Sequence, residues 1–247
     1  MSPKPTDTRG LAELPDEVFD LADTLEVLNL SGNALSSLPD DLHRLPHLRV
    51  LFCSDNAFTE LPECLGQCAK LSMIGFKANQ ISHVSAAALP PLLRWLILTD
   101  NRISQLPSEL GERPLLQKLM LAGNQLTQLP ESLTNCSNLE LIRIASNRLT
   151  GLPDWLLALP SLTWLAYAGN PVEMAADVAE AARFLKLLSG RNHRVFTGVA
   201  VVRDGRTAVR VNETRVTFKP LCDQEIATDV AAGAGGGPHG AGGGDEP

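Results

Sequence analysis

Leucine recurs in a nine-residue frame, Leu-x-x-Leu-x-Leu-x-x-Asn, from residue 25 to residue 170. Within each copy, apolar positions 4 and 6 alternate with variable positions 3, 5 and 7, which is the period of a short β-strand. Five of the first six copies are followed by Leu-Pro, and the third copy has Val84-Ser85 instead. Proline ends such a strand because it has no backbone N–H. The frame ends, at intervals of 22 or 23 residues, on Asn33, Asn56, Asn79, Asn101, Asn124, Asn147 and Asn170.

One copy cannot bury its own leucines, so neighbouring copies must stack. The spacing therefore predicts an α/β fold, a leucine-rich repeat solenoid of seven 22–23-residue repeats with a parallel concave sheet. The asparagines are interpreted as structural, because an amide side chain can accept from and donate to the backbone of the adjacent turn. Residues 11–21 form half a repeat at one end. Helical spacing of apolar residues over 174–188 predicts a C-terminal capping helix at the other.

Positions 3, 5 and 7 are expected to point outward from the sheet, and we call their side chains the concave face. This face is apolar and aromatic in its middle, with a few basic residues. Such a patch is typical of an interaction site, and the alternative is that these side chains only pack on each other across strands. The partner-binding residues predicted on it are Phe52, Met73, Lys77, Trp95, Ile97, Lys118, Met120, Leu141, Arg143 and Trp164.

Composition narrows the function. The formal charge is −7, whereas general nucleic-acid binders are basic. No run of about 18 apolar residues predicts a membrane span, and the first ten residues lack the apolar core of a secretory signal. Five cysteines without disulfide-framework spacing fit a reducing compartment. We therefore expect a cytoplasmic protein with no cofactor, no metal and no membrane partner, and leave its oligomeric state open.

The remaining cysteines and histidines are interpreted as structural or surface residues. Cys64 and Cys68 lie four residues apart, but no histidine has the spacing that would complete a metal site with them. Cys68 and Cys136 fill the same slot of the repeat, which favours buried thiols. His43, His47 and His83 are expected at the surface.

The segments LRVLFCSDN, LRWLILTDN, LQKLMLAGN and WLAYAGNP resemble the leucine-rich repeat region that precedes the kinase domain in repeat-linked serine/threonine kinases. The resemblance covers about residues 11–171. It implies that these repeats recognise a protein partner. The chain has no HRD-type catalytic loop and no DFG motif, so kinase activity is not carried over.

The 23-residue spacing stops after Asn170-Pro171. Residues 195–202 and 207–218 are predicted strands, and Asp204-Gly205 between them is a hairpin signal. Both faces of this hairpin carry valines, Val199 and Val201 on one and Val202, Val209 and Val211 on the other. An isolated hairpin is marginally stable in water, so we expect it either to dock on the end of the solenoid or to pair with another chain.

The strings ARFLKLLSGRNHRVFTGVAVV and ETRVTFKPLCDQEI resemble the Maf family of nucleoside triphosphate pyrophosphatases, over about residues 174–227. The resemblance implies a nucleotide-hydrolysing relative, but the family's chemical motifs are missing. This part of the chain has no SPRR-type phosphate segment and no ADT-type aspartate, and Gly169-Asn170-Pro171 stands where the family has a GKP lysine. A glycine-rich tail replaces the late DKAG-type segment. We therefore predict that the chain is not an enzyme.

A third hypothesis concerns charge. Between Arg183 and Lys219 there are nine Lys and Arg residues against two acids, so this segment could bind an anion or a nucleic acid; a solvated hairpin face is the alternative.

We divide the chain into a disordered N-terminus (1–10), a repeat domain (11–172), a capping helix with the truncated Maf-like hairpin (173–230) and a disordered Gly-rich tail (231–247). The predicted function is protein–protein scaffolding on the concave face, in intracellular signalling.

Overall fold

The structure is a computed structural model that describes residues 10–171, 192–203, 206–217, 220 and 222–224. It divides into two compact units, Met1–Glu173 and Met174–Pro247, which are described separately. The predicted capping helix over 174–188 and both predicted disordered ends lie outside the described residues, apart from residue 10.

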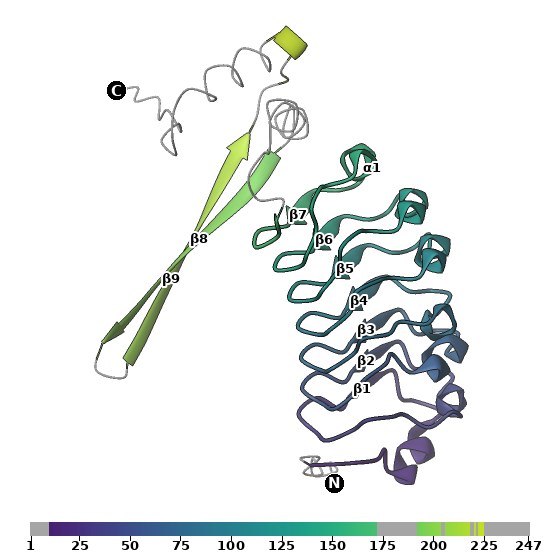
Figure 1. Ribbon diagram of the computed structural model, residues 1–247. Helices are drawn as coiled ribbons and strands as arrows, with labels where there is room; N and C mark the ends of the chain where they lie inside the picture. The colour runs from purple at the N-terminus through teal and green to yellow at the C-terminus, as the bar shows by residue number, and fades with distance from the viewer. Residues whose placement is uncertain (1–9, 172–191, 204–205, 218–219, 221, 225–247) are drawn as a thin grey trace. The chain divides into compact units, whose positions relative to one another are not determined.

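The first unit contains one parallel sheet of seven strands, with the strands in sequence order (Figure 1). Each strand consists of positions 3, 4 and 5 of one frame, and each pairs with the same positions of the next repeat. The predicted solenoid is confirmed. The strands are β1 Val27–Asn29, β2 Val50–Phe52, β3 Met73–Gly75, β4 Trp95–Ile97, β5 Lys118–Met120, β6 Leu141–Arg143 and β7 Trp164–Ala166.

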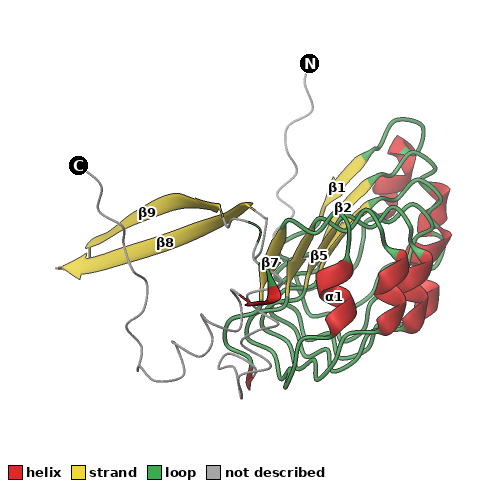
Figure 2. Ribbon diagram, turned by 90° about the horizontal axis from the view of Figure 1, so that it is seen from above, coloured by secondary structure: helices red, strands yellow, loops and turns green. Residues whose placement is uncertain are grey.

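Short helices line the side of this unit opposite the sheet (Figure 2). A proline with extended backbone immediately precedes most of these helices, as at Pro62 and Pro107. Proline ends the preceding extended segment and is well suited to the start of a helix. Successive helices pack tightly: a Cβ at Gly66 would lie 1.9 Å from the carbonyl oxygen of Ala87. Between residues 10 and 171, six are 3₁₀ helices and the seventh is α-helical: η1 Asp16–Leu21, η2 Leu42–Arg44, η3 Glu63–Gln67, η4 Ala86–Ala88, η5 Ser108–Glu112, η6 Glu131–Asn135 and α1 Asp154–Ala158.

The core lies between the sheet and the helices. Frame leucines such as Leu51, Leu96 and Leu119 are completely buried, as stacking requires. Phe58 and Phe76 are also completely buried, and their rings meet edge to face with centroids 5.0 Å apart. The core is therefore filled mainly by leucine side chains, which occupy the same positions in each repeat and stack on one another.

Position 8 of every frame has a left-handed backbone, which the sequence analysis did not predict. Glycine occupies it in three copies, and other residues adopt it at a steric cost, with φ of 55° at Asp55, 53° at Ala78, 57° at Asp100 and 53° at Ser146. The turn between strand and asparagine thus needs one reversed residue per repeat. The small or Asp/Gly residues at this slot were the available signal.

The second unit contains an antiparallel ribbon of two strands, β8 Asn192–Arg203 and β9 Arg206–Thr217. Arg203 pairs with Arg206, which leaves a two-residue connection and confirms the predicted hairpin. The register puts Val199 and Val201 on one face of the ribbon and Val202, Val209 and Val211 on the other. In the described part of the chain, β8 and β9 pair only with each other.

Candidate functional site

The ten predicted partner-binding residues lie on neighbouring strands of the seven-stranded sheet, except Lys77, which follows β3. In β2, β4 and β5, position 4 is buried and positions 3 and 5 are half-buried. Because side chains alternate along a strand, positions 3 and 5 share the face opposite the core. The fold therefore gathers these side chains into two adjacent rows that cross the strands. Their role as a binding site stays a prediction.

Trp95 and Lys118 are partners in the register of β4 and β5. The Lys118 Nζ lies 3.7 Å from the centroid of the Trp95 ring, which is cation–π geometry. Such a contact is worth about 0.5–1 kcal/mol where it is exposed. It fixes the position of the ammonium group above the face and covers part of the indole.

Phe52 packs differently from Trp95. Its register partner in β3 is Gly75, and a Cβ at Gly75 would lie only 2.6 Å from Cδ1 of Phe52. The phenyl ring thus occupies the space that a side chain at Gly75 would need, and Gly75 is buried beneath it. At this end of the concave face, cross-strand packing accounts for the aromatic residue, as the alternative interpretation proposed.

Charge on the concave face is positive. Lys77 lies 3.9 Å from the carboxylate of Asp100, so its charge is balanced at the edge of the face. Arg143 is exposed at the end of β6. Positions 3, 5 and 7 contain no Asp or Glu in any copy of the frame.

The frame asparagines form a continuous hydrogen-bonded ladder inside the repeat unit. Asn124 is typical: its Oδ1 accepts from the Ile103 N–H at 3.0 Å, and its Nδ2 donates to the carbonyls of Leu98 and Leu121 at 2.9 Å each. Each asparagine therefore ties its own turn to the preceding repeat. The last four asparagines of the ladder are buried, and no buried side-chain N or O atom of the described residues lacks a partner.

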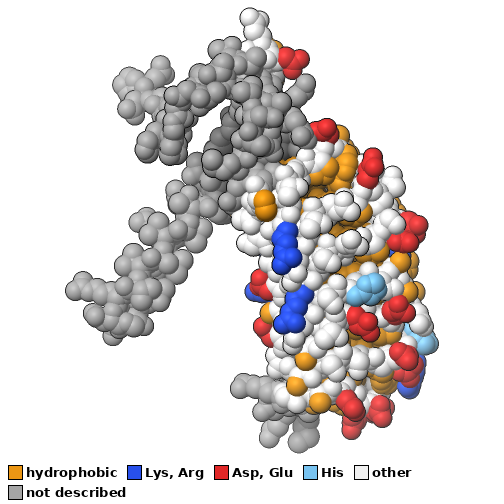
Figure 3. Space-filling model, in the orientation of Figure 1, with side chains coloured by type: hydrophobic (Ala, Val, Ile, Leu, Met, Phe, Trp, Pro, Cys, Tyr) orange, Lys and Arg blue, Asp and Glu red, His pale blue; other side chains and the backbone are white. Residues whose placement is uncertain are grey.

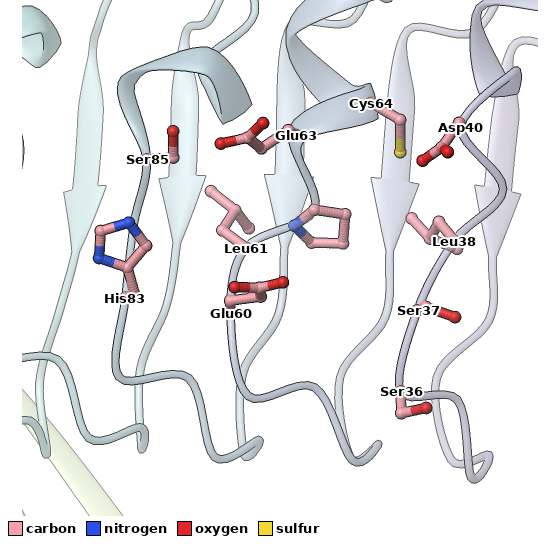
Figure 4. A pocket seen from close by; sticks show the side chains of 11 residues that line it. Ser36, Ser37, Leu38, Asp40, Glu60, Leu61, Glu63, Cys64, His83 and Ser85 are labelled. Carbon is pink, nitrogen blue, oxygen red and sulfur yellow. The ribbon is translucent and has the colours of Figure 1, made fainter.

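The structure also has a pocket of about 270 Å³ that the sequence analysis missed. It lies on the flank between the asparagine turns and the first 3₁₀ helices. Figure 4 shows Glu60 between His83 and Ser37, which fill the same slot in three successive repeats. The slot lies outside the leucine frame, so the repeat pattern alone gave no reason to group them. The lining residues are Ser36, Ser37, Leu38, Asp40, Glu60, Leu61, Pro62, Glu63, Cys64, His83 and Ser85.

Acidic side chains gather along the helical side of the repeats (Figure 3). The three carboxylates of the pocket, Asp40, Glu60 and Glu63, are all exposed. Water can therefore solvate these carboxylates, so their charge does not require a bound cation. No group of three or more His, Cys, Asp or Glu residues in the described part of the chain is arranged to hold a metal ion.

Four cysteines are buried free thiols, and Cys222 is an exposed one. Burial raises the pKa of the Cys68 and Cys136 thiols to about 11. Burial, with the nearby Cys68 and Asp40, raises the pKa of Cys64 to about 12. All three thiols are protonated at neutral pH, which makes them poor nucleophiles. The prediction that Cys68 and Cys136 are buried thiols is confirmed.

The ribbon groups three of the basic residues. Arg203 pairs with Arg206, and Arg210 pairs with Val199, so all three arginines belong to one face.

The described helices include none long and apolar enough to cross a lipid bilayer.

Comparison with protein families identifies both parts of the chain. Models of leucine-rich repeats match residues 23–83 and 115–136. A model described as "Maf-like protein" matches residues 143–244. The N-terminal part of the chain therefore contains leucine-rich repeats and the C-terminal part a Maf-like segment. The Maf-like match begins inside the solenoid, because residues 143–166 include the last residue of β6, all of α1 and all of β7.

Curated relatives match the Maf-like segment. A dTTP/UTP pyrophosphatase of Maricaulis maris is 61% identical over 56 residues, 22% of this chain and 27% of that protein. A dTTP/UTP pyrophosphatase of Caulobacter vibrioides is 47% identical over 72 residues, 29% of this chain and 37% of that protein. The chain thus spans well under half the length of these relatives.

Solved structures match the repeat fold. A leucine-rich repeat protein of Leptospira interrogans has a TM-score of 0.64 at 26% identity, and the match covers 73% of this chain and 46% of that one. A chain of the Drosophila Toll–Spätzle complex has a TM-score of 0.54 at 24% identity, covering 65% of this chain and 26% of that one. The second match supports the fold alone.

Proposed function

We propose that this chain is a protein–protein interaction scaffold that holds a partner on the concave face of its repeats, in an intracellular signalling setting. The observation that supports this proposal is the pair of adjacent rows at positions 3 and 5. From β4 to β7 they present Trp95, Ile97, Met120 and Trp164 half-buried on one face. Half-buried Trp and Met with nearby arginine are typical of the centre of an interface.

The test is a loss of partner capture. We expect full-length protein on beads to retain a defined set of proteins from a lysate of its source cells, and Trp95→Ala with Trp164→Ala to lose that set. Each removed tryptophan takes away a large contact area at the centre of the face. Trp155→Ala is the matched control, because Trp155 is half-exposed on α1, on the opposite side.

The double variant must keep its melting temperature within a few degrees of the wild type. Unchanged capture by a folded double variant would contradict the proposal. A chain ending near residue 190 should keep the partner, because we place binding in residues 11–172 and not in the Maf-like segment.

A second candidate function is nucleoside triphosphate hydrolysis, favoured by the 61% identity to a dTTP/UTP pyrophosphatase over 56 residues. A pyrophosphatase must hold a divalent ion on carboxylates and bind the triphosphate with cations. The SPRR-type, ADT-type and GKP motifs are absent from residues 174–227, and the Ala-Asp-Thr string of this sequence, at residues 22–24, lies directly before the first leucine frame. We expect no pyrophosphate release from dTTP or UTP with Mg²⁺ or Mn²⁺. Turnover above that of a mock preparation would revive this function.

A further inference from the structure

The concave face has the opposite charge from the whole chain. The chain carries 28 acidic and 21 basic residues, a net charge of −7. Positions 3, 5 and 7 of the repeats nevertheless hold three cations, Lys77, Lys118 and Arg143, and no acid. Random placement of charges would favour acids there. The face is therefore electrostatically distinct, and a ligand on it meets positive charge.

Two of these cations have no carboxylate partner. Asp100 balances Lys77, whereas neither Lys118 nor Arg143 forms an ion pair among the described residues. Lys118 lies over the Trp95 ring, which positions its ammonium group without neutralising it. Arg143 extends from the exposed end of β6. Both charges are thus available to an anionic group.

The register arranges these cations with apolar side chains in a two-by-two block on β5 and β6. Lys118 pairs with Leu141, and Met120 pairs with Arg143. The two cations therefore occupy one diagonal of the block, and Met120 and Leu141 the other. Strand spacing and rise put the Cα atoms of Lys118 and Arg143 about 8 Å apart. Both side chains can reach one carboxylate between them when Lys118 turns from the Trp95 ring toward β6.

We propose that this block, with Trp95 and Trp164 on the flanking strands, binds an extended protein segment in which an acidic side chain lies between apolar ones. This inference rests on the proposed function and specifies its partner. The carboxylate pairs with Lys118 and Arg143, and its apolar neighbours pack on Met120, Leu141 and the indoles. Charge-assisted contacts of this kind add specificity in a partly desolvated site.

Selection of a random 12-residue phage-displayed peptide library on the full chain tests this inference. We expect enriched peptides to carry Asp or Glu next to aliphatic or aromatic residues. Lys118→Glu with Arg143→Glu should weaken the best such peptide at least tenfold by fluorescence anisotropy. The same library selected on this double variant should instead enrich Lys or Arg. Arg102→Glu with Arg148→Glu, exposed arginines just after the frame asparagines, should change affinity less than twofold.

If Lys118→Glu lowers the melting temperature, Arg143→Glu alone carries the test with the same expected direction. Enrichment of neutral or basic peptides, an empty selection, or equal binding of single-stranded DNA would overturn the inference. Neutral or basic peptides that still depend on Trp95 and Trp164 would leave the proposed function standing. Acidic peptides that ignore both tryptophans would instead contradict the proposed function.

Discussion

The repeat sheet and the C-terminal ribbon use strands in opposite ways. Strands β1–β7 are three residues long, yet each lies in a seven-stranded sheet over a continuous core. Strands β8 and β9 are twelve residues long and pair only with each other in the described chain. Long strands give many hydrogen bonds, but stability depends on hiding apolar side chains from water. The comparison indicates that stacking of repeats contributes more to the stability of a sheet than the length of its strands does.

Amide hydrogen exchange gives the largest expected difference between the two regions. Backbone amides of β4 and β5 should exchange at rates set by global unfolding, because opening them breaks the core. Amides of β8 and β9 should exchange at least a hundredfold faster, since a lone ribbon is marginally stable. Mass spectrometry of pepsin fragments measures both. Equal protection would mean that another part of the chain covers the ribbon, as the docking alternative holds.

Removing one step of the asparagine ladder tests how tightly the repeats are coupled. Asn124→Ala leaves the buried Ile103 N–H without its acceptor, while the Leu98 carbonyl keeps its hydrogen bond from Asn101 Nδ2. One buried donor without a partner costs about 1–3 kcal/mol, so the unfolding free energy should fall by that amount. Urea denaturation measures the loss. Asn135→Ala, an exposed asparagine at the end of η6, is the control and should cost under about 0.5 kcal/mol.

A smaller effect, with the opposite sign, is expected at position 8. Ala78 adopts a φ of 53°, a left-handed conformation that costs an L-residue about 1–2 kcal/mol. Ala78→Gly removes that cost and adds about 0.5–1 kcal/mol of chain entropy, so it should stabilise the protein by about 0.5–1 kcal/mol. Ala145→Gly, outside the left-handed region, should destabilise it in the same urea assay. Destabilisation by both changes would show that the turn does not hold Ala78 under strain.

The solenoid could be predicted from the sequence because the same period recurs seven times. A copy that departs from the pattern, such as the third, does not obscure the period. The register followed directly: Trp95 and Lys118 share position 3, and equal spacing places them side by side. The exact contact of Lys118 over the indole did not follow, since it depends on a side-chain rotamer. The packing of the Phe52 ring over Gly75 could not be predicted either, because it depends on which two residues are partners across β2 and β3.

The flank pocket and the left-handed turn were missed for a different reason. Ser37, Glu60 and His83 share a slot, but that slot is polar and variable, so it carries no hydrophobic period. Position 8 had a recognisable choice of small or turn-forming residues that the leucine pattern overshadowed. Non-leucine slots of a repeat therefore need the same column-by-column comparison as the leucines.

Methionine methyl NMR tests the central claim, partner binding on the concave face, most directly. The chain has four methionines: Met73 and Met120 lie on that face, and Met1 and Met174 lie outside the leucine frame in the sequence. With ¹³C-methyl methionine and the best acidic peptide from the library selection, we predict that the Met120 signal shifts most and Met73 less, while Met1 and Met174 stay in place. A bound peptide that shifts Met174 or Met1 and leaves Met120 unmoved would contradict the account.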